Sequence, residues 1–173
     1  MNMNRRSHRR LLAVDLSSRG FGFAVFDGSN KLADWGTRVR DTSTDLITKA
    51  KRLINSYEPH ILALLDPRTP RSRRPERTIE VSDTLVRLAR AEGLQPMLIP
   101  WTAVQSICGG SSKAEKEQIA AKIAERFPEL APLVPRKRKP WESEFERMNV
   151  LDAVALGRTA YVLDEQYHQR RPA

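Results

Sequence analysis

The chain has few cysteines and histidines, and this shortage excludes several kinds of chemistry. Its one cysteine, Cys108, cannot form an internal disulfide. The three histidines have no zinc-ligand spacing with it and no recognisable spacing of a nucleophile and its base. They are His8, His60 and His168. We therefore expect Cys108 to be a small packed side chain in a protein of the reducing cytoplasm.

The sequence also lacks long apolar runs. None approaches the ~20 residues that are needed to span a bilayer. The basic start, MNMNRRSHRR, is followed by a strand-like segment rather than by a cleavable apolar region. We expect a cytoplasmic protein with no membrane partner.

Positive charge is in excess. Thirty Lys and Arg face twenty-one Asp and Glu, for a formal net charge of +9. Such a charge favours a polyanionic partner and steers its approach, although a membrane surface or solubility alone can also account for it. Nucleic acid is the leading candidate partner. Residues 1–10 form a basic arm that either contacts phosphate or is a solvated terminus.

The pattern of apolar and turn residues is typical of one mixed α/β domain. The 173 residues, 40% of them hydrophobic, suffice for a single core. Three successive strand-like segments predict an antiparallel meander, and alternating helices and strands predict parallel strands after it. We expect a mixed five-stranded sheet flanked by helices, in a domain over 11–163 with a tail over 164–173. The predicted strands cover 11–18, 21–28, 31–40, 61–66 and 95–100, and the predicted helices cover 42–59, 78–93, 111–130 and 142–163.

Three aspartates lie at the ends or on the faces of these elements. Asp15 and Asp66 close strand-like segments, and Asp152 lies on the last predicted helix. Carboxylates brought together in this way would hold Mg²⁺ or Mn²⁺, and two such ions can stabilise the attacking and leaving oxygens of a phosphodiester displacement. In a basic protein this suggests a nuclease. The alternative for each acid is a turn or cap, above all for Asp66 before Pro67.

Three segments together resemble a known family. VDLSSRGFGFAVF has an aspartate at the end of one strand and glycines in the next. LIPWTAVQSICGGSSKAEKEQIAAKI has a strand that ends at a proline, a short helix, a glycine turn and an AEK helix start. NVLDAVALG has an acidic residue before an Ala-rich helix. Over residues 11–163 the order resembles the ribonuclease H-like fold and, within it, the RuvC family of Holliday junction resolvases.

The resemblance implies roles for individual residues. Asp15 and Asp152 match metal ligands of the family, and Asp66 stands where the family usually has glutamate. Asn149 stands where many resolvases have aspartate, and it offers a neutral carbonyl oxygen without a charge. A glutamate just upstream could replace that charge, although glutamates also suit a helix N-terminus. These are Glu142, Glu144 and Glu146.

Arginines follow Asp66 in the segment PRTPRSRRPER, where the resemblance implies a loop that faces the junction. Family members often have an aromatic residue there, but none lies between Tyr57 and Trp101. An arginine could stack on a base instead, or the run is a solvated loop. Lys116 matches the family's AEKxQ lysine at a helix start, where N–H groups attract phosphate. The candidate nucleic-acid-binding residues are Arg68, Arg71, Arg73, Arg74, Lys113 and Lys116, with the basic cluster at 136–139 in addition.

These expectations combine in one function with two alternatives. We expect a homodimeric, Mg²⁺-dependent endonuclease that cuts branched DNA, with Mn²⁺ able to substitute and the nucleoid as its location. Its expected ligands for two ions are Asp15, Asp66, Asp152 and Asn149. The missing aromatic residue favours a nuclease of the same fold that acts on structured RNA or other DNA. Asn149 leaves open a catalytically weak nucleic-acid-binding module.

Overall fold

The fold is built on one mixed sheet of five strands. The computed structural model describes residues 9–40, 42–69, 74–135 and 146–170. The strand order is β3-β2-β1-β4-β5, in which the first three strands are antiparallel and β4 and β5 run parallel to β1. The strands are β1 Arg10–Ser17, β2 Gly20–Asp27, β3 Leu32–Val39, β4 Ile61–Leu65 and β5 Gln95–Ile99. The predicted mixed five-stranded sheet is confirmed.

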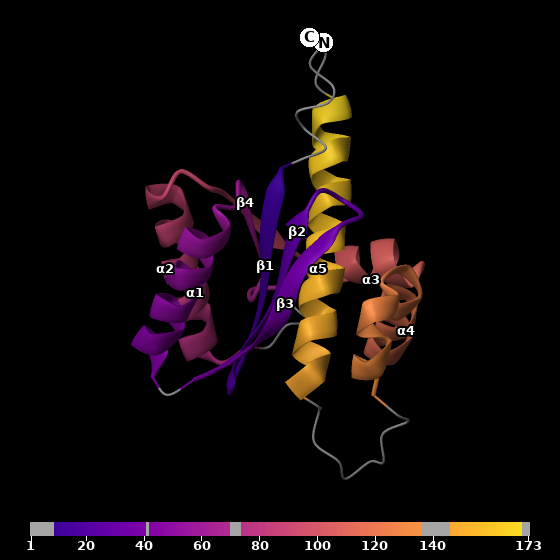
Figure 1. Ribbon diagram of the computed structural model, residues 1–173, viewed down its shortest axis with the longest axis horizontal. Helices are drawn as coiled ribbons and strands as arrows, with labels where there is room; N and C mark the ends of the chain where they lie inside the picture. Colours follow the sequence, from indigo (N-terminus) through magenta and orange to yellow (C-terminus); the bar gives the residue numbers. More distant parts are fainter. Residues whose placement is uncertain (1–8, 41, 70–73, 136–145, 171–173) are drawn as a thin grey trace.

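Helices cover both faces of this sheet (Figure 1). Helices α1 and α2 lie on one face, and α5 crosses the other face with α3 and α4 on its outer side. The helices are α1 Ser43–Tyr57, α2 Glu76–Ala91, α3 Trp101–Gly109, α4 Lys116–Arg126, the 3₁₀ helix η1 Pro128–Leu133 and α5 Glu146–Gln169. Within the described ranges, no helix combines the length and the apolar character that crossing a membrane requires.

The first strand is apolar on both sides because helices cover both faces. Leu11 and Ala13 pack with α5, whereas Leu12 and Val14 pack with α1 and α2. Successive strand residues point to opposite faces, so a strand covered twice is a nearly continuous apolar run. Asp15 interrupts that run on the α5 side, close to where β1 ends.

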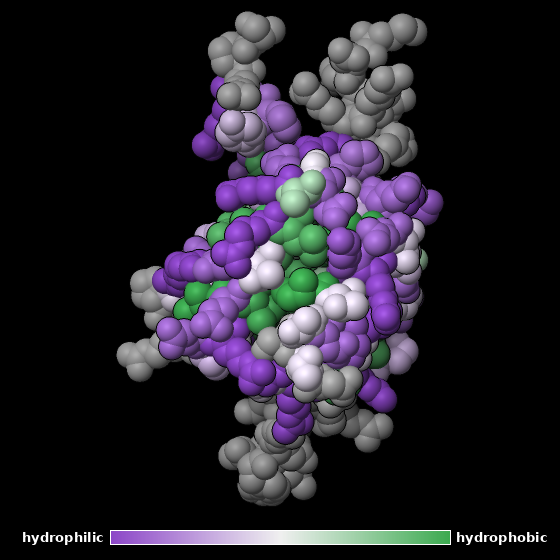
Figure 2. Space-filling model, turned by 90° about the vertical axis from the view of Figure 1, so that its left-hand side faces the viewer, coloured by the Kyte–Doolittle hydropathy of each residue, from purple (hydrophilic) through white to green (hydrophobic). Residues whose placement is uncertain are grey.

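The outer face of α1 and α2 is not uniformly polar. Figure 2 shows hydrophobic surface at the centre of this face, with hydrophilic residues around it. The hydrophobic side chains of the two helices that stay partly exposed while packing on the core are Ile47, Tyr57, Val86 and Leu88.

Several helix boundaries differ from the predicted ones. A single helix over 111–130 is wrong, because Glu115 and Gln118 form a capping box that starts α4 only at Lys116. That helix stops at Arg126, and η1 begins at Pro128. Helix α2 runs over 76–91 rather than 78–93. Helix α5 continues past 163 to Gln169, and Asp164 in this extension is buried and ion-pairs with Arg9 at 3.1 Å.

Candidate functional site

Two of the predicted acids are buried where α5 crosses β1. Asp15, near the end of β1, is 4% exposed, and Asp152, in the first part of α5, is 5% exposed. Burial disfavours an ionised carboxylate unless a charge or a hydrogen bond compensates it. Two ionised acids at such depth therefore require compensating charges or hydrogen bonds.

A glycine brings α5 this close to the sheet. Gly22 pairs with Asp15 across β1 and β2. A Cβ atom at Gly22 would lie 2.1 Å from the backbone oxygen of Asn149, so any other residue would push the helix away. Asp152 is about one helical turn beyond Asn149. Both aspartates consequently lie at the same crossing.

Each buried aspartate has a cationic side chain beside it. Arg74 Nη2 lies 3.5 Å from Asp15 Oδ1, and Arg74 Nη1 donates to the backbone oxygen of Leu16 at 2.7 Å. Lys116, the first residue of α4, donates to Asp152 Oδ2 at 2.9 Å. The two positive charges come from different elements and compensate the two buried negative ones.

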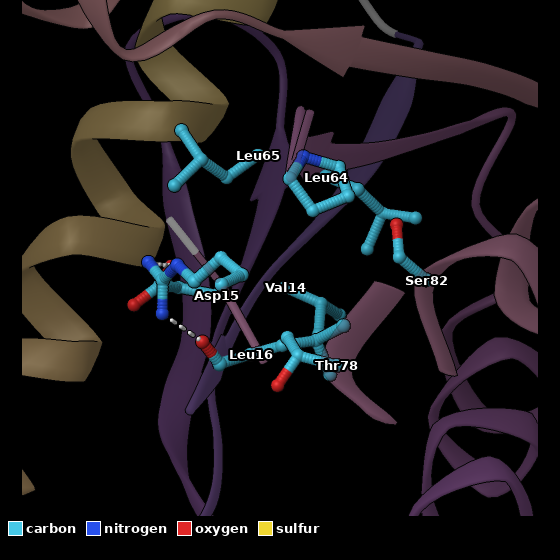
Figure 3. Close-up of a pocket in the computed structure, with 9 residues that line it drawn as sticks. Val14, Asp15, Leu16, Leu64, Leu65, Thr78 and Ser82 are labelled. Atoms are coloured by element: carbon cyan, nitrogen blue, oxygen red, sulfur yellow. Dashed lines mark hydrogen bonds and ion pairs between the residues drawn. The ribbon is translucent and has the colours of Figure 1, made fainter. Parts of the chain in front are cut away.

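The parallel pairing of β1 with β4 ends at Val14 with Leu64, and β4 itself ends at Leu65. The side chains of Asp15 and Leu65 both point toward α5 (Figure 3). Asp66 lies just beyond β4, where its Oδ1 accepts a hydrogen bond from the N–H of Arg68 at 3.0 Å. This contact is the turn geometry that aspartate commonly adopts before a loop. The structure thus brings Asp15 and Asp152 together, with Asp66 in the adjacent turn.

Asn149 is half-buried at the end of β1. Its Nδ2 donates to Ser17 Oγ at 3.2 Å, which fixes the orientation of the amide beside the first strand. The glutamates considered as a replacement charge are not placed by the structure. Glu142 and Glu144 lie outside the described residues, as does the side chain of Glu146.

The predicted basic residues divide into paired and exposed ones. Arg68 ion-pairs with Asp83 of α2 at 2.6 Å. Their hydrogen bond lowers the pKa of Asp83 and raises that of Arg68. Arg74 and Lys116 face the buried aspartates, and Lys113 is exposed just before α4. The remaining predicted contacts, Arg71, Arg73 and the cluster at 136–139, lie outside the described residues.

The sequence alone does not identify two features of this region. Trp101, half-buried at the start of α3, has the Lys116 ammonium 5.7 Å from its ring centre. Arg19 lies in the turn after β1, in a pocket that Asn149 also lines, whereas the guanidinium of Arg38 lies over Phe23 on the opposite face of the sheet. The available signals are an aromatic residue directly after a strand-ending proline and two isolated arginines. Such signals are too common to mark a site without the fold.

The cysteine is a packed side chain, as expected. Cys108 Sγ lies 3.4 Å from the backbone oxygen of Ala155 and 3.5 Å from Thr159 Oγ1. Burial raises the pKa of the thiol, which disfavours the thiolate that a nucleophile requires.

The described acids suit a magnesium ion with few protein ligands. Among the described residues, no three His, Cys, Asp or Glu side chains form a group that could hold a metal ion. Mg²⁺ usually keeps several waters and is held by one or two carboxylates together with substrate phosphates. The two carboxylates of Asp15 and Asp152, buried at the crossing of α5 and β1, are the number that such a site requires. Ligation by Asp66 stays a prediction.

No protein-family model and no curated protein sequence matches the chain. Solved structures do match it. The structure of Thermus thermophilus RuvC has a TM-score of 0.65 at 14% identity and covers 91% of this chain and 96% of its own. T. thermophilus RuvC in complex with Holliday junction substrate has a TM-score of 0.63 at 13% identity, with 91% and 96% covered. The yeast mitochondrial Holliday junction resolvase Ydc2 has a TM-score of 0.66 at 14% identity, with 95% and 82% covered.

These likenesses extend over most of the chain. The protein has the mixed, helix-flanked sheet of the ribonuclease H-like class. Within that class it has the RuvC-like resolvase fold. The resemblance found in three short segments of sequence is therefore confirmed for the fold.

Proposed function

We propose that this protein is a metal-dependent endonuclease that cuts phosphodiester bonds in branched DNA. The RuvC-like fold supports a junction-resolving nuclease, and the net charge of +9 supports a polyanionic partner. The observation that carries the proposal is the pair of buried aspartates, Asp15 and Asp152, each with a cationic side chain beside it.

In this function Asp15 and Asp152 hold Mg²⁺, with Mn²⁺ able to substitute. When bound, the ion supplies Lewis-acid stabilisation of the attacking water and of the leaving 3′ oxygen. Burial and the close contact of α5 with the sheet hold both carboxylates in position, which limits the reorganisation needed for binding. Lys116 and Arg74, already at the carboxylates, donate to nonbridging oxygens of the phosphate.

Asp66 and Asn149 are the weaker members of the proposed ligand set. Asp66 must give up its hydrogen bond with the N–H of Arg68 to turn toward an ion. Asn149 contributes a neutral oxygen and no charge. We therefore expect a second ion to be held more weakly than the first.

We also propose that the protein acts as a homodimer. An apolar patch with a polar border is typical of a protein interaction site. The face of α1 and α2 has that character (Figure 2), with Ile47, Val86 and Leu88 only partly buried. Sedimentation of the protein and of a Val86→Asp variant tests this interface, and a monomeric wild type would contradict it.

The nuclease proposal is tested by incubating the protein with labelled four-way junction, flap, duplex DNA and structured RNA. Each substrate is combined with Mg²⁺, Mn²⁺ or EDTA. Asp15→Asn and Asp152→Asn remove one ligand charge each. Asp27→Asn is the control, because this partly exposed aspartate lies at the other end of the β1 and β2 pair.

Each site variant should lose cleavage by more than about a hundredfold, which corresponds to about 3 kcal/mol of barrier. Binding of the junction in EDTA should stay close to that of the wild type, because the basic surface is unchanged. A site variant that keeps more than about a tenth of the activity contradicts the assignment. Cleavage of RNA but not of the junction would favour the alternative substrate.

A further inference from the structure

A tryptophan ring borders the aspartate pair on its α4 side. Trp101 is the first residue of α3, directly after Pro100, and it is half-buried against the core that packs around α5. The Lys116 ammonium lies 5.7 Å from the centre of the Trp101 ring. The same ammonium donates to Asp152 Oδ2 at 2.9 Å. Lys116 therefore lies between a carboxylate of the site and an aromatic ring next to it.

The helices that carry the ring and the lysine are fixed to each other. Gln105 of α3 is buried, and its Nε2 donates to the backbone oxygen of Ala114 at 2.9 Å. Ala114 is two residues before Lys116, where the capping box of Glu115 and Gln118 starts α4. Both helices also pack on each other and on α5 (Figure 1). The fold therefore sets where the backbone of Lys116 lies relative to the ring.

The lysine side chain needs a partner that a metal ion does not take from it. Lysine has a flexible four-carbon stem, so holding its ammonium in one place costs rotamer entropy. Asp152 holds that ammonium in the structure, but in the proposed function the same carboxylate is a metal ligand. An aromatic face attracts a cation through its quadrupole and does not compete for the metal ion. Trp101 thus provides a contact that Lys116 keeps after Asp152 has become a ligand.

The lysine also lies where a phosphate would reach it. The side chain of Lys116 is 36% exposed, against 5% for that of Asp152. The ammonium is therefore on the solvent side of the buried carboxylate, from which a nucleic-acid strand approaches. Lysine binds phosphate as a compact point charge, and its contribution depends on where the ammonium is held.

We infer that Trp101 is a positioning residue that holds the Lys116 ammonium beside the aspartate pair, where the ammonium donates to a phosphate oxygen of the bound strand. Trp101 acts through Lys116 rather than by touching the nucleic acid. A cation that is already held loses little conformational entropy when it binds an anion. The inference rests on the proposed function, because it explains how Lys116 is kept in place at the same site.

The test is a double-mutant cycle of junction binding in protein that carries Asp152→Asn. This change removes the carboxylate that pairs with Lys116, so the ring has to hold the ammonium without it. Fluorescence anisotropy in EDTA measures the affinity of this protein for labelled junction, and then with Trp101→Leu, with Lys116→Ala and with both. An effect of Trp101→Leu that depends on Lys116 isolates their contact from the general cost of losing a large side chain.

Trp101→Leu should weaken junction binding about threefold while Lys116 is present, the size of a partly exposed cation–π contact, and should have no effect together with Lys116→Ala. Trp101→Phe keeps an aromatic face and should retain most of the affinity. Trp35→Leu is the matched control, since Trp35 is a half-buried tryptophan of the same core on β3, separated from β1 by β2. It should leave binding unchanged.

A second measurement tests the phosphate contact of Lys116 itself. The salt slope, which is the slope of log K against log salt, should fall by about 0.9 on duplex DNA in Lys116→Ala, because one phosphate contact is lost. Denaturant unfolding shows whether each variant is folded. If Trp101→Leu unfolds, Trp101→Phe takes its place in the cycle, and its smaller loss should likewise disappear together with Lys116→Ala.

The outcomes separate this inference from the proposed function. Equal losses with and without the Lys116 side chain overturn it, because Trp101 then acts on its own. Unchanged affinity in folded Trp101→Leu, an equal loss in Trp35→Leu or an unchanged salt slope in Lys116→Ala also overturns it. A loss that requires Lys116 supports the inference even if the wild type cuts no substrate, which overturns the nuclease proposal alone. Absence of any nucleic-acid binding overturns both.

Discussion

The two sides of the aspartate pair hold arginines in opposite electrostatic situations. On the α2 side, Arg74 faces Asp15 and Arg68 faces Asp83. On the β3 side, neither Arg19 nor Arg38 pairs with a carboxylate of the described chain. In the arginine-rich segment after Asp66, the described arginines therefore have their charges compensated by carboxylates.

The density of arginines in a sequence therefore does not measure the positive charge that the folded protein offers to a ligand. An exposed pair such as Arg68 with Asp83 contributes little to stability and gives way easily to a phosphate. Arg74 is held more firmly, because its partner Asp15 is buried and would otherwise be uncompensated. The α2 side consequently supports the acids, whereas the arginines of the β3 side contribute no carboxylate pair within the described chain.

We expect the largest effect from a variant that prevents the close approach of α5 to β2, on which both sides depend. Gly22→Ala places a Cβ atom against the backbone of Asn149 and pushes α5 away from β2. The cost should be about 3 kcal/mol or more of unfolding free energy, because backbone atoms cannot move aside as a flexible side chain can. Denaturant unfolding measures this loss, and cleavage should fall with it.

Gly93→Ala is the control for that change. No atom lies within 4 Å of the added Cβ, although the φ of +77° disfavours a side chain. It should cost about 1 kcal/mol and leave cleavage unchanged. Equal losses in the two variants would contradict the view that the close approach of α5 builds the site.

A second variant lowers stability while leaving both sides of the pair unchanged. The Tyr161 hydroxyl donates to the backbone oxygen of Arg9 and accepts from the N–H of Gly28 at 3.2 Å. Tyr161→Phe leaves both backbone groups without this partner and should cost about 1–3 kcal/mol at pH 8. The salt slope of DNA binding should not change, and a changed slope would show that the two ends of α5 are coupled.

The same tyrosine predicts a dependence on alkaline pH. Burial raises the pKa of Tyr161 from 10.0 to about 12. Above pH 10 the unfolded chain loses this proton while the folded protein keeps it, so the stabilising effect is complete below pH 10 and declines between pH 10 and 12. The difference in unfolding free energy between the wild type and Tyr161→Phe should shrink over that range. A constant difference would contradict the raised pKa.

We expect the smallest effect from a variant that leaves an arginine of the α2 side without its carboxylate partner, as the arginines of the β3 side are. Asp83→Asn removes the carboxylate that pairs with Arg68. The freed arginine should steepen the salt slope of DNA binding by at most about 0.9, the value of one additional phosphate contact. Glu80→Gln, at an exposed position of the same helix, is the control with the same change of charge. A slope that stays the same in both would place Arg68 away from the DNA.

We also predict that the ion pair between Arg68 and Asp83 stops contributing to stability in acid. The hydrogen bond from Arg68 lowers the pKa of Asp83 from its ordinary 3.8, so the contribution of the pair is present above that value and is lost as pH falls through the lowered one. Unfolding curves of the wild type and Asp83→Asn should therefore converge in acid. Curves that stay apart below that range would argue against the pairing.

Much of the fold was predictable because its signals are local. The apolar run around Leu12 and Val14, the Thr42 cap of α1 and the acids at the ends of elements each depend on a few adjacent residues. Long helices were less predictable. The run over 111–130 has helical spacing throughout, yet the capping box at Glu115 and the turn before it divide that run.

The candidate site was predictable only in part. The sequence points to Asp15 and Asp152, and the fold buries both at one crossing. It also points, less strongly, to Asp66, but β4 ends at Leu65 and leaves Asp66 in a turn. A shift of one residue along a strand reverses the face of its side chains, and register depends on pairing with distant strands.

The sequence by itself determined the elements, the charge and the identity of the acids, because these follow from residue types and short-range spacing. Only the tertiary structure decided which charges are compensated. Asp83 and Arg68 meet through the packing of α2, and Arg38 lies over Phe23 of the neighbouring strand instead of beside a carboxylate. Electrostatic interaction depends on distance in space, and residues far apart in the chain are brought within that distance only by folding.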